Sequence, residues 1–234
     1  MGLPGSRGHE AVDAHTFAAW GVDFLKYDNC FSPDDEPPRG AYEAMRDALN
    51  ATGRPVLFSV CDWGAGDVWE WGAGVGNAWR TTPDVAPTWA SILANAQATA
   101  GLARFAGPGG WNDPDMLEVG NAPLSLLPRA WTAQFALWCV LKAPLLVGAD
   151  LTRLHADALR LLTNADLIAW NQDPLGVAGD RVWQAGPYSA WVAPLADGGR
   201  AVALLCTRPP DVQARRRVGV RLGGSGPGRG GGGA

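Results

Sequence analysis

The stretch HEAVDAHTFAAWGVDFLKYDNC, residues 9–30, contains one complete helix-to-strand unit. Its first half places alanines at helical spacing, and Gly21 is typical of the residue at which a helix ends. The apolar run that follows is typical of a buried strand. This stretch therefore predicts a helix over 9–20 and a strand over 22–25.

The same pair of elements recurs along the chain. A helical pattern over 41–49 precedes the β-rich segment PVLFSV, and two further helical patterns precede ARFAG and APLLVGAD. Alternation of helices with buried strands predicts a parallel α/β sheet. The expected strands after the first lie at 55–60, 76–79, 103–107 and within 143–150.

Polar side chains follow four successive predicted strands. In a parallel α/β sheet the carboxyl ends of the strands face the ligand crevice, so these side chains are site candidates. The alternative is that they are ordinary turn and helix-cap residues, and four clusters in succession weigh against it. The clusters are Lys26, Asp28 and Asn29; Cys61 and Asp62; Arg80 and Asp84; and Asn112, Asp113 and Asp115.

The composition excludes some partners. A net charge of −4 on 234 residues gives no electrostatic reason to expect nucleic acid or an anionic membrane surface. The chain has no apolar run of the length that spans a bilayer, and its first residues do not form a basic-then-apolar leader. The twelve Trp fit flat platforms for sugar rings as well as bulky cores.

The motifs restrict the chemistry. The chain has no P-loop, GxSxG or GxGxxG motif, and its histidines have no metal-site spacing, so we expect no cofactor and no metal. Its cysteines are too far apart for a zinc site, which leaves a sparse disulfide or free thiols. Paired carboxylates in a Trp-lined pocket are the equipment of glycoside hydrolysis. Lys26 would favour the charged form of Asp28, which suits a nucleophile, and Asp84 is then the candidate acid.

Six ordered segments resemble the melibiase-type glycoside hydrolases, glycoside hydrolase family 27, which comprise α-galactosidases and α-N-acetylgalactosaminidases. The resemblance extends over about residues 4–206. The segments are PGSRGHEAVDAHTFAAWGVDFLKYDNC, FSVCDWG, AWRTTPDV, FAGPGGWNDPDMLEVGN, KAPLLVGADL and LIAWNQDPLG.

The resemblance implies a fold and a domain organisation. Residues 1–178 are expected to form about the last five βα units of a (β/α)8 barrel, and 179–206 the start of an antiparallel β domain. The tail at 207–234 is rich in Arg, Gly and Pro and is expected to be disordered. The first three barrel strands and the cysteine that would pair with Cys30 are missing from the resemblance. We therefore expect an N-terminally truncated chain that folds poorly by itself, with open sheet edges that favour self-association, for example as a homodimer.

The resemblance also implies a role for each site residue. Asp28 corresponds to the nucleophile and Asp84 to the acid/base of a retaining mechanism. The other positions bind substrate, with Lys26 bonded to the sugar and Arg80 reaching its 2-position, while Asp113 and Asp115 are expected to be structural. A carboxylate at Asp62 favours galactose over N-acetylgalactosamine. The remaining substrate-binding positions are Cys61, Trp63, Trp111 and Met116.

The expected function is α-galactosidase activity on a terminal α-galactoside. Three alternatives remain open, namely an inactive fragment or pseudoenzyme of the same family, an α-N-acetylgalactosaminidase, and a galactoside-binding module. The resemblance implies a secreted, vacuolar, lysosomal or cell-wall protein.

Overall fold

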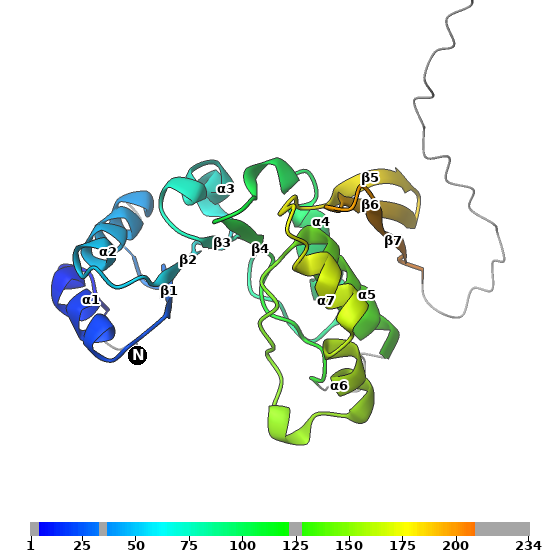
Figure 1. The fold of residues 1–234 in the computed structure, drawn as a ribbon, viewed down its shortest axis with the longest axis horizontal. Coiled ribbons are helices and arrows are strands. Elements are labelled where there is room, and N and C mark those ends of the chain that lie inside the picture. Colours follow the sequence, from blue (N-terminus) through cyan, green and yellow to red (C-terminus); the bar gives the residue numbers. More distant parts are fainter. Residues whose placement is uncertain (1–4, 33–36, 122–127, 209–234) are drawn as a thin grey trace, which may run out of the picture.

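A parallel sheet of four strands organises the first half of the protein. The computed structural model describes residues 5–32, 37–121 and 128–208. The four strands are neighbours in chain order, so each βα crossover leads to the adjacent strand (Figure 1). They are β1 (Phe24–Asp28), β2 (Leu57–Cys61), β3 (Ala78–Arg80) and β4 (Trp111–Asp113).

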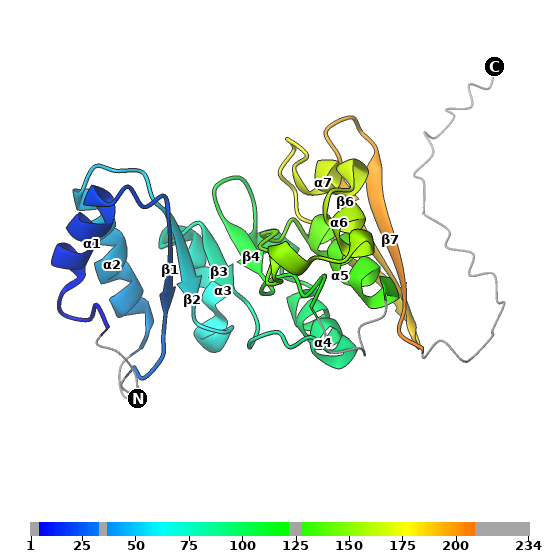
Figure 2. The same ribbon diagram turned by 90° about the horizontal axis from the view of Figure 1, so that it is seen from below.

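Helices cover one face of this sheet and continue beyond it. Figure 2 shows α1 and α2 side by side on the outer side of β1 and β2, α3 beside β3, and α4 to α7 towards the far end of the molecule. The helices are α1 (Glu10–Ala19), α2 (Arg39–Ala51), α3 (Val68–Trp71), α4 (Trp89–Thr99), α5 (Pro128–Leu141), α6 (Ala156–Leu162) and α7 (Ala165–Asn171).

The strands extend further towards their carboxyl ends than the apolar runs indicated. β1 continues through Lys26 to Asp28, and β3 includes Arg80, so these polar residues lie within strands rather than after them. Period-two alternation explains the difference, because polar side chains can occupy one face of a strand while apolar ones occupy the other. In β1 the side chains of Phe24, Lys26 and Asp28 are exposed, whereas those between them are half-buried.

The strand predicted at 103–107 is wrong. Ala103–Phe105 form a 3-10 helix, and the chain then makes a tight turn in which Gly107 bridges Gly110. The chain therefore joins the sheet only at β4. Short apolar runs do not distinguish a helical turn from a strand, which accounts for the error.

The segment predicted as a strand within 143–150 forms one isolated bridge to the loop after β4 and no strand of the parallel sheet. Leu117 and Val147 form an isolated parallel bridge, in which the Gly148 amide donates to the Leu117 carbonyl at 2.9 Å. This contact lies beyond β4 in the chain.

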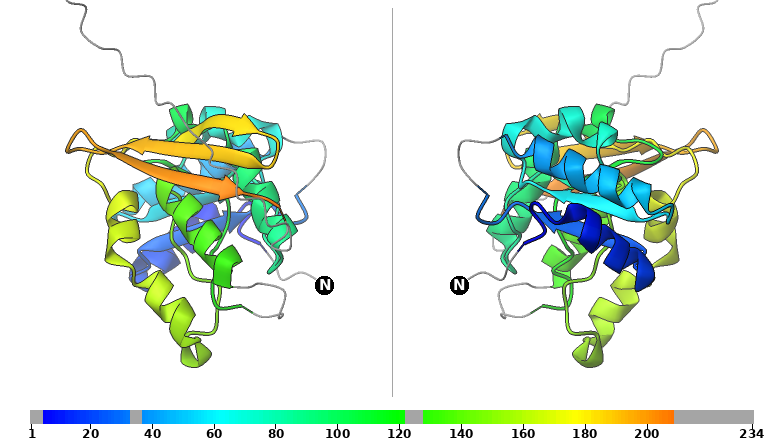
Figure 3. Two further views of the ribbon diagram at one scale, coloured as in Figure 1. Left: turned by 90° about the vertical axis from the view of Figure 1, so that its right-hand side faces the viewer. Right: turned by 90° about the vertical axis from the view of Figure 1, so that its left-hand side faces the viewer.

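The second half of the protein carries an antiparallel sheet, as predicted. Its strands are β5 (Asp180–Ala185), β6 (Tyr188–Pro194) and β7 (Arg200–Cys206), with β6 in the middle. Figure 3 shows this sheet at the end of the molecule opposite α1 and α2. Of the tail at 207–234, positions 209–234 lie outside the described residues, and the domain boundaries remain a prediction.

Two apolar cores hold these layers together. In the first, Tyr42, Met45 and Leu49 of α2 pack with Phe58 and Val60 of β2. In the second, α5 packs against β6 and β7 on one side and other helices on the other. Nearly every residue in the last two turns of α5 is buried, which is typical of a helix enclosed on all sides.

The four cysteines all lie in the described residues and are unpaired. Cys61 and Cys139 are buried, and Cys30 and Cys206 are exposed. Free thiols, one of the two possibilities left open by the sequence, are therefore what this chain contains. Within the described ranges no helix has the length and apolar character needed to cross a bilayer.

The packing of α2 on the sheet predicts the effect of replacing a buried side chain of this helix by a smaller one. Met45 is fully buried, so Met45→Ala leaves a cavity and is expected to lower the free energy of unfolding by about 2–5 kcal/mol. Asn50→Ala, on the exposed side of the same helix, is the control and is expected to change it by less than about 0.5 kcal/mol. Urea titration of both variants measures the difference; equal effects would contradict the burial of this face.

Candidate active site at the carboxyl ends of the parallel strands

The register of the sheet places candidate residues from four strands in one row. Asp28 of β1 is opposite Cys61 of β2, and Arg80 of β3 is opposite Asp113 of β4. The Arg80 Nη1 atom donates to the Cys61 Sγ atom at 3.8 Å, which joins the two pairs. The row predicted from strand ends is thus present as contiguous side chains.

Two carboxylates in this region are open to solvent. Asp28 is exposed, and the Asp84 side chain is 81% exposed. The Asp28 Oδ1 atom accepts hydrogen bonds from the Asn29 amide at 2.8 Å and from the Cys30 thiol at 3.4 Å. The hydrogen bond and charge of Asp28 raise the pKa of the Cys30 thiol, and the charge of Asp84 adds to the effect. The charges of both carboxylates therefore act on the Cys30 thiol in the same direction.

Arg80 is a fully buried cation that supports this region. Its side chain is 1% exposed, and its Nη2 atom lies 3.1 Å from Asp84 Oδ1 and 3.0 Å from Asp115 Oδ2. The same atom donates to the Thr82 carbonyl at 3.0 Å. A buried guanidinium needs such acceptors, because it has lost its hydration. Arg80 thereby ties the strand end to the loop that carries Asp84.

Asn29 connects the first two strand ends. Its Nδ2 atom donates to the Asp62 Oδ1 atom at 2.9 Å, while its own amide donates to Asp28. Asp62 is fully buried, and its Oδ2 atom has no hydrogen-bond partner. Burial raises the pKa of Asp62 to about 6, against the opposing effect of the Asn29 hydrogen bond. The site therefore contains a second, buried carboxyl beside the exposed Asp28.

Lys26 lies on the same face of β1 as Asp28 and contributes positive charge to the site. Burial raises the pKa of the Cys61 thiol to about 12, and the charges of Lys26 and Arg80 act in the opposite direction. Burial likewise raises the pKa of Asp113, with Arg80 again opposing it. Two cations thus offset the desolvation of neighbouring acidic groups.

The loop after β2 presses closely on the end of β3. Trp63 has a left-handed backbone, with φ of 51°, and the Gly64 amide donates to the Arg80 carbonyl at 3.0 Å. A Cβ atom on Gly64 would lie 2.5 Å from the Thr81 carbonyl oxygen, so only glycine fits there. This contact fixes the half-buried Trp63 beside the row of strand ends.

The remaining predicted residues come from β4 and the loop after it. Trp111 and Asp113 line a cavity of about 490 Å³ along the sheet, which Asp28 and Asp84 do not line. Met116 is 40% exposed and follows Asp115 in the loop after β4. Hydrogen bonds and ion pairs of Asn29 and Arg80 thus connect Asp28 with Asp62, and Cys61 with Asp84.

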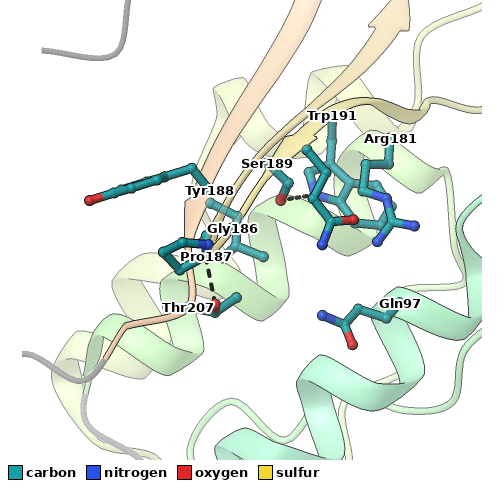
Figure 4. Close-up of a pocket in the computed structure, with 10 residues that line it drawn as sticks. Gln97, Arg181, Gly186, Pro187, Tyr188, Ser189, Trp191 and Thr207 are labelled. Atoms are coloured by element: carbon teal, nitrogen blue, oxygen red, sulfur yellow. Dashed lines mark hydrogen bonds between the residues drawn. The ribbon is translucent and has the colours of Figure 1, made fainter.

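A smaller cavity of about 50 Å³ lies away from the strand ends, between α4 and the antiparallel sheet (Figure 4). There Gln97 faces Arg181, whose guanidinium lies 5.6 Å from the ring centre of Trp191. This cavity contains none of the predicted site residues. No group of His, Cys, Asp and Glu side chains in the described part of the chain is arranged to hold a metal ion.

A family model for melibiases, described as alpha galactosidase A, matches residues 1–173 of the chain. The chain belongs to the melibiase family. This confirms the resemblance seen in the six sequence segments, and the family is one of glycoside hydrolases.

Individual melibiases are also similar. Alpha-galactosidase 3 of Arabidopsis thaliana is 46% identical over 90% of this chain and 49% of its own length. The alpha-galactosidase of Cyamopsis tetragonoloba is 46% identical over 86% of this chain and 48% of its own length. The chain spans about half the length of the curated relatives it matches.

Solved melibiase structures share the fold. An alpha-galactosidase from Saccharomyces cerevisiae, 36% identical, superposes with a TM-score of 0.83 over 88% of this chain and 53% of that one. Alpha-galactosidase I from Mortierella vinacea, 33% identical, gives a TM-score of 0.81 over 88% of this chain and 57% of that one. The predicted fold class, part of a (β/α)8 barrel followed by antiparallel strands, is confirmed.

The melibiase site contains contacts that the sequence did not reveal. The sequence placed Asn29 in the polar cluster that follows the first predicted strand. Its hydrogen bond to Asp62 could not be predicted, because the two residues are 33 positions apart in the chain. The acceptor role of Asp115 towards Arg80 depends on a loop conformation that no local pattern indicates.

The buried Asp62 predicts a pH-dependent stability. Its folded pKa lies near 6, above the ordinary value of 3.8, so its contribution is full below about pH 4 and is lost as pH rises through 6. Asp62→Asn stays neutral, so the variant is expected to gain about 2 kcal/mol relative to the parent between pH 4 and pH 7. Urea unfolding at several pH values measures this; a difference that is constant with pH would contradict it.

Proposed function

We propose that this chain carries the catalytic carboxylates of a retaining α-galactosidase, which removes terminal α-D-galactosyl residues from oligosaccharides or glycoconjugates. The observation that carries the proposal is the pair of exposed carboxylates, Asp28 at the end of β1 and Asp84 in the loop after β3, in a member of the melibiase family. The relatives named above are alpha-galactosidases, which supports the same activity here.

The proposed reaction has two displacement steps. In the first, the Asp28 carboxylate attacks the anomeric carbon, the glycosidic bond breaks, and Asp84 transfers its proton to the leaving oxygen. In the second, Asp84 takes a proton from water, whose oxygen attacks the same carbon and releases Asp28. The two inversions retain the anomeric configuration, and both carboxyl groups return to their starting forms.

The supporting residues have roles that follow from their positions. Lys26 shares the face of Asp28, so its ammonium is proposed to bond the sugar, and Arg80 is proposed to act at the 2-position through the end of β3. Cys61, Asp62 and Trp63 follow one another at the end of β2, and a carboxyl at Asp62 is proposed to favour galactose over N-acetylgalactosamine, as the resemblance implies. Trp111 and Met116 are proposed to contact the substrate from the loop side.

We propose that the enzyme acts outside the cytosol, in a secreted, vacuolar, lysosomal or cell-wall setting, as the resemblance to its family implies. Its partner is an α-galactoside, and a homodimer is the proposed assembly, since β1 has a strand partner on only one side within the described sheet.

Removal of either carboxylate tests the proposed roles. Asp28→Ala is expected to abolish hydrolysis of p-nitrophenyl α-galactoside by the 234-residue chain, and Asp84→Ala to lower it by about 10²–10⁴-fold. Asp166→Asn, on the exposed first turn of α7, is the control and is expected to retain full activity. Activity that survives in Asp28→Ala would refute the assignment of the nucleophile.

The choice of sugar is tested with matched substrates. The chain is expected to hydrolyse p-nitrophenyl α-galactoside at least about tenfold faster, in kcat/KM, than the corresponding α-N-acetylgalactosaminide. The reverse preference would favour the α-N-acetylgalactosaminidase alternative. Saturable binding of galactose by calorimetry with no turnover of either substrate would favour a binding module, and the absence of both would favour an inactive fragment.

A further inference from the structure

Asp115 is a buried carboxylate that contacts the loop carrying Asp84. It is 4% exposed, and its Oδ2 atom lies 3.0 Å from Arg80 Nη2. The same oxygen accepts a hydrogen bond from the Val85 amide at 2.7 Å. Because Val85 directly follows Asp84, one carboxylate oxygen holds both the cation beside Asp84 and the backbone next to it.

The backbone of Asp115 is itself held in an unusual conformation. Its φ of 82° is left-handed, which is costly for a residue other than glycine. The Asp115 amide donates to Asp113 Oδ1 at 2.8 Å, and its carbonyl accepts from the indole of the buried Trp138 at 2.7 Å. Contacts on both sides of the residue therefore maintain the strain, as occurs where a side chain must be aimed accurately.

Asn95 of α4 ties the same two loops together from another direction. Its Nδ2 atom donates to the Pro83 carbonyl at 3.1 Å and to the Pro114 carbonyl at 3.0 Å. The loop at 83–85 is thus bonded before Asp84 by Asn95 and after it by Asp115. Asp84 itself is exposed, so its position depends on these buried contacts rather than on its own packing.

Asp115 and Asp84 both contact the Arg80 guanidinium. The guanidinium faces two carboxylates, one buried and one exposed, and both lie within 3.1 Å of the same nitrogen. Asp115 therefore holds the guanidinium from the buried side, while Asp84 contacts it from the exposed side.

We propose that Asp115 is a positioning residue that fixes the loop of Asp84 and holds the Arg80 guanidinium beside that carboxyl. The proposal rests on the proposed function of Asp84 as acid/base, and it assigns Asp115 a role in the reaction without contact to the substrate.

The first experiment measures loop order without any need for turnover. In Asp115→Ala the Val85 amide loses its acceptor, so hydrogen exchange in a peptide covering 82–88 is expected to become about tenfold faster or more. Exchange in β1 is expected to stay unchanged. Glu118→Gln is the matched control, because Glu118 is a buried carboxyl in the same loop that accepts from the Asn121 side chain. It is expected to leave the exchange of 82–88 unchanged.

The second experiment uses Asp115→Asn, which keeps the size of the side chain and an acceptor oxygen while removing the charge. This variant is expected to retain protection of 82–88 and to lower kcat for p-nitrophenyl α-galactoside about tenfold or more, with KM changed less than about twofold. A purely structural residue would not lower kcat while KM and the protection of 82–88 stay unchanged.

The outcomes separate this proposal from the proposed function. Unchanged exchange at 82–88 in Asp115→Ala would overturn the positioning role whether or not the chain is active. In an active chain, an unchanged kcat in Asp115→Asn would overturn the role of the Asp115 charge in holding Arg80 beside Asp84. A parent chain without hydrolysis would refute the proposed function, while the exchange experiment would still decide whether Asp115 holds the loop.

Discussion

The candidate site depends on the burial of one guanidinium. Arg80 is enclosed at the end of β3, where desolvation makes an unpaired charge very costly. Its acceptors come from the end of β2, from the loop after β3 and from the loop after β4, namely Cys61, Thr82, Asp84 and Asp115. Three segments that are separate in the chain therefore have to converge on one side chain.

This convergence places the exposed groups at the carboxyl ends of β1 and β3, on either side of β2. Asp28 and Asp84 are accessible, and neither is held by packing of its own side chain. Each is instead fixed through a neighbouring residue, the half-buried Asn29 next to β1 and the buried Arg80 in β3. Reactive groups in many enzymes are arranged in this way, with accessible atoms on a rigid and hydrogen-bonded support. Gly64 contributes to the support, because its lack of a side chain allows the loop after β2 to reach the Thr81 carbonyl.

The two apolar cores explain how the backbone is held in place around the many polar side chains of the site. The α2 core anchors β1 and β2 from the outer face, and the α5 core anchors the loop after β4 through the indole of Trp138. The apolar packing thus holds the backbone on both sides of the polar row. The strained φ of Asp115 is maintained by the same arrangement.

Some features of this protein follow from its sequence alone. The alternation of helices and strands, the switch to antiparallel strands near residue 180 and the cluster KYDNC at the end of β1 were all readable, because periodicity and strand-end position are local properties. The exact ends of the strands could not be predicted. Lys26, Asp28 and Arg80 are polar and yet lie within β1 and β3, so the end of an apolar run does not mark the end of the strand. The turn at 103–105 was mistaken for a strand because apolar runs of that length fit both. Only the tertiary structure decided that Asn29 bonds Asp62 and that Asp115 holds Arg80 and Val85, because each of these bonds joins loops whose approach is set by the packing of the whole sheet.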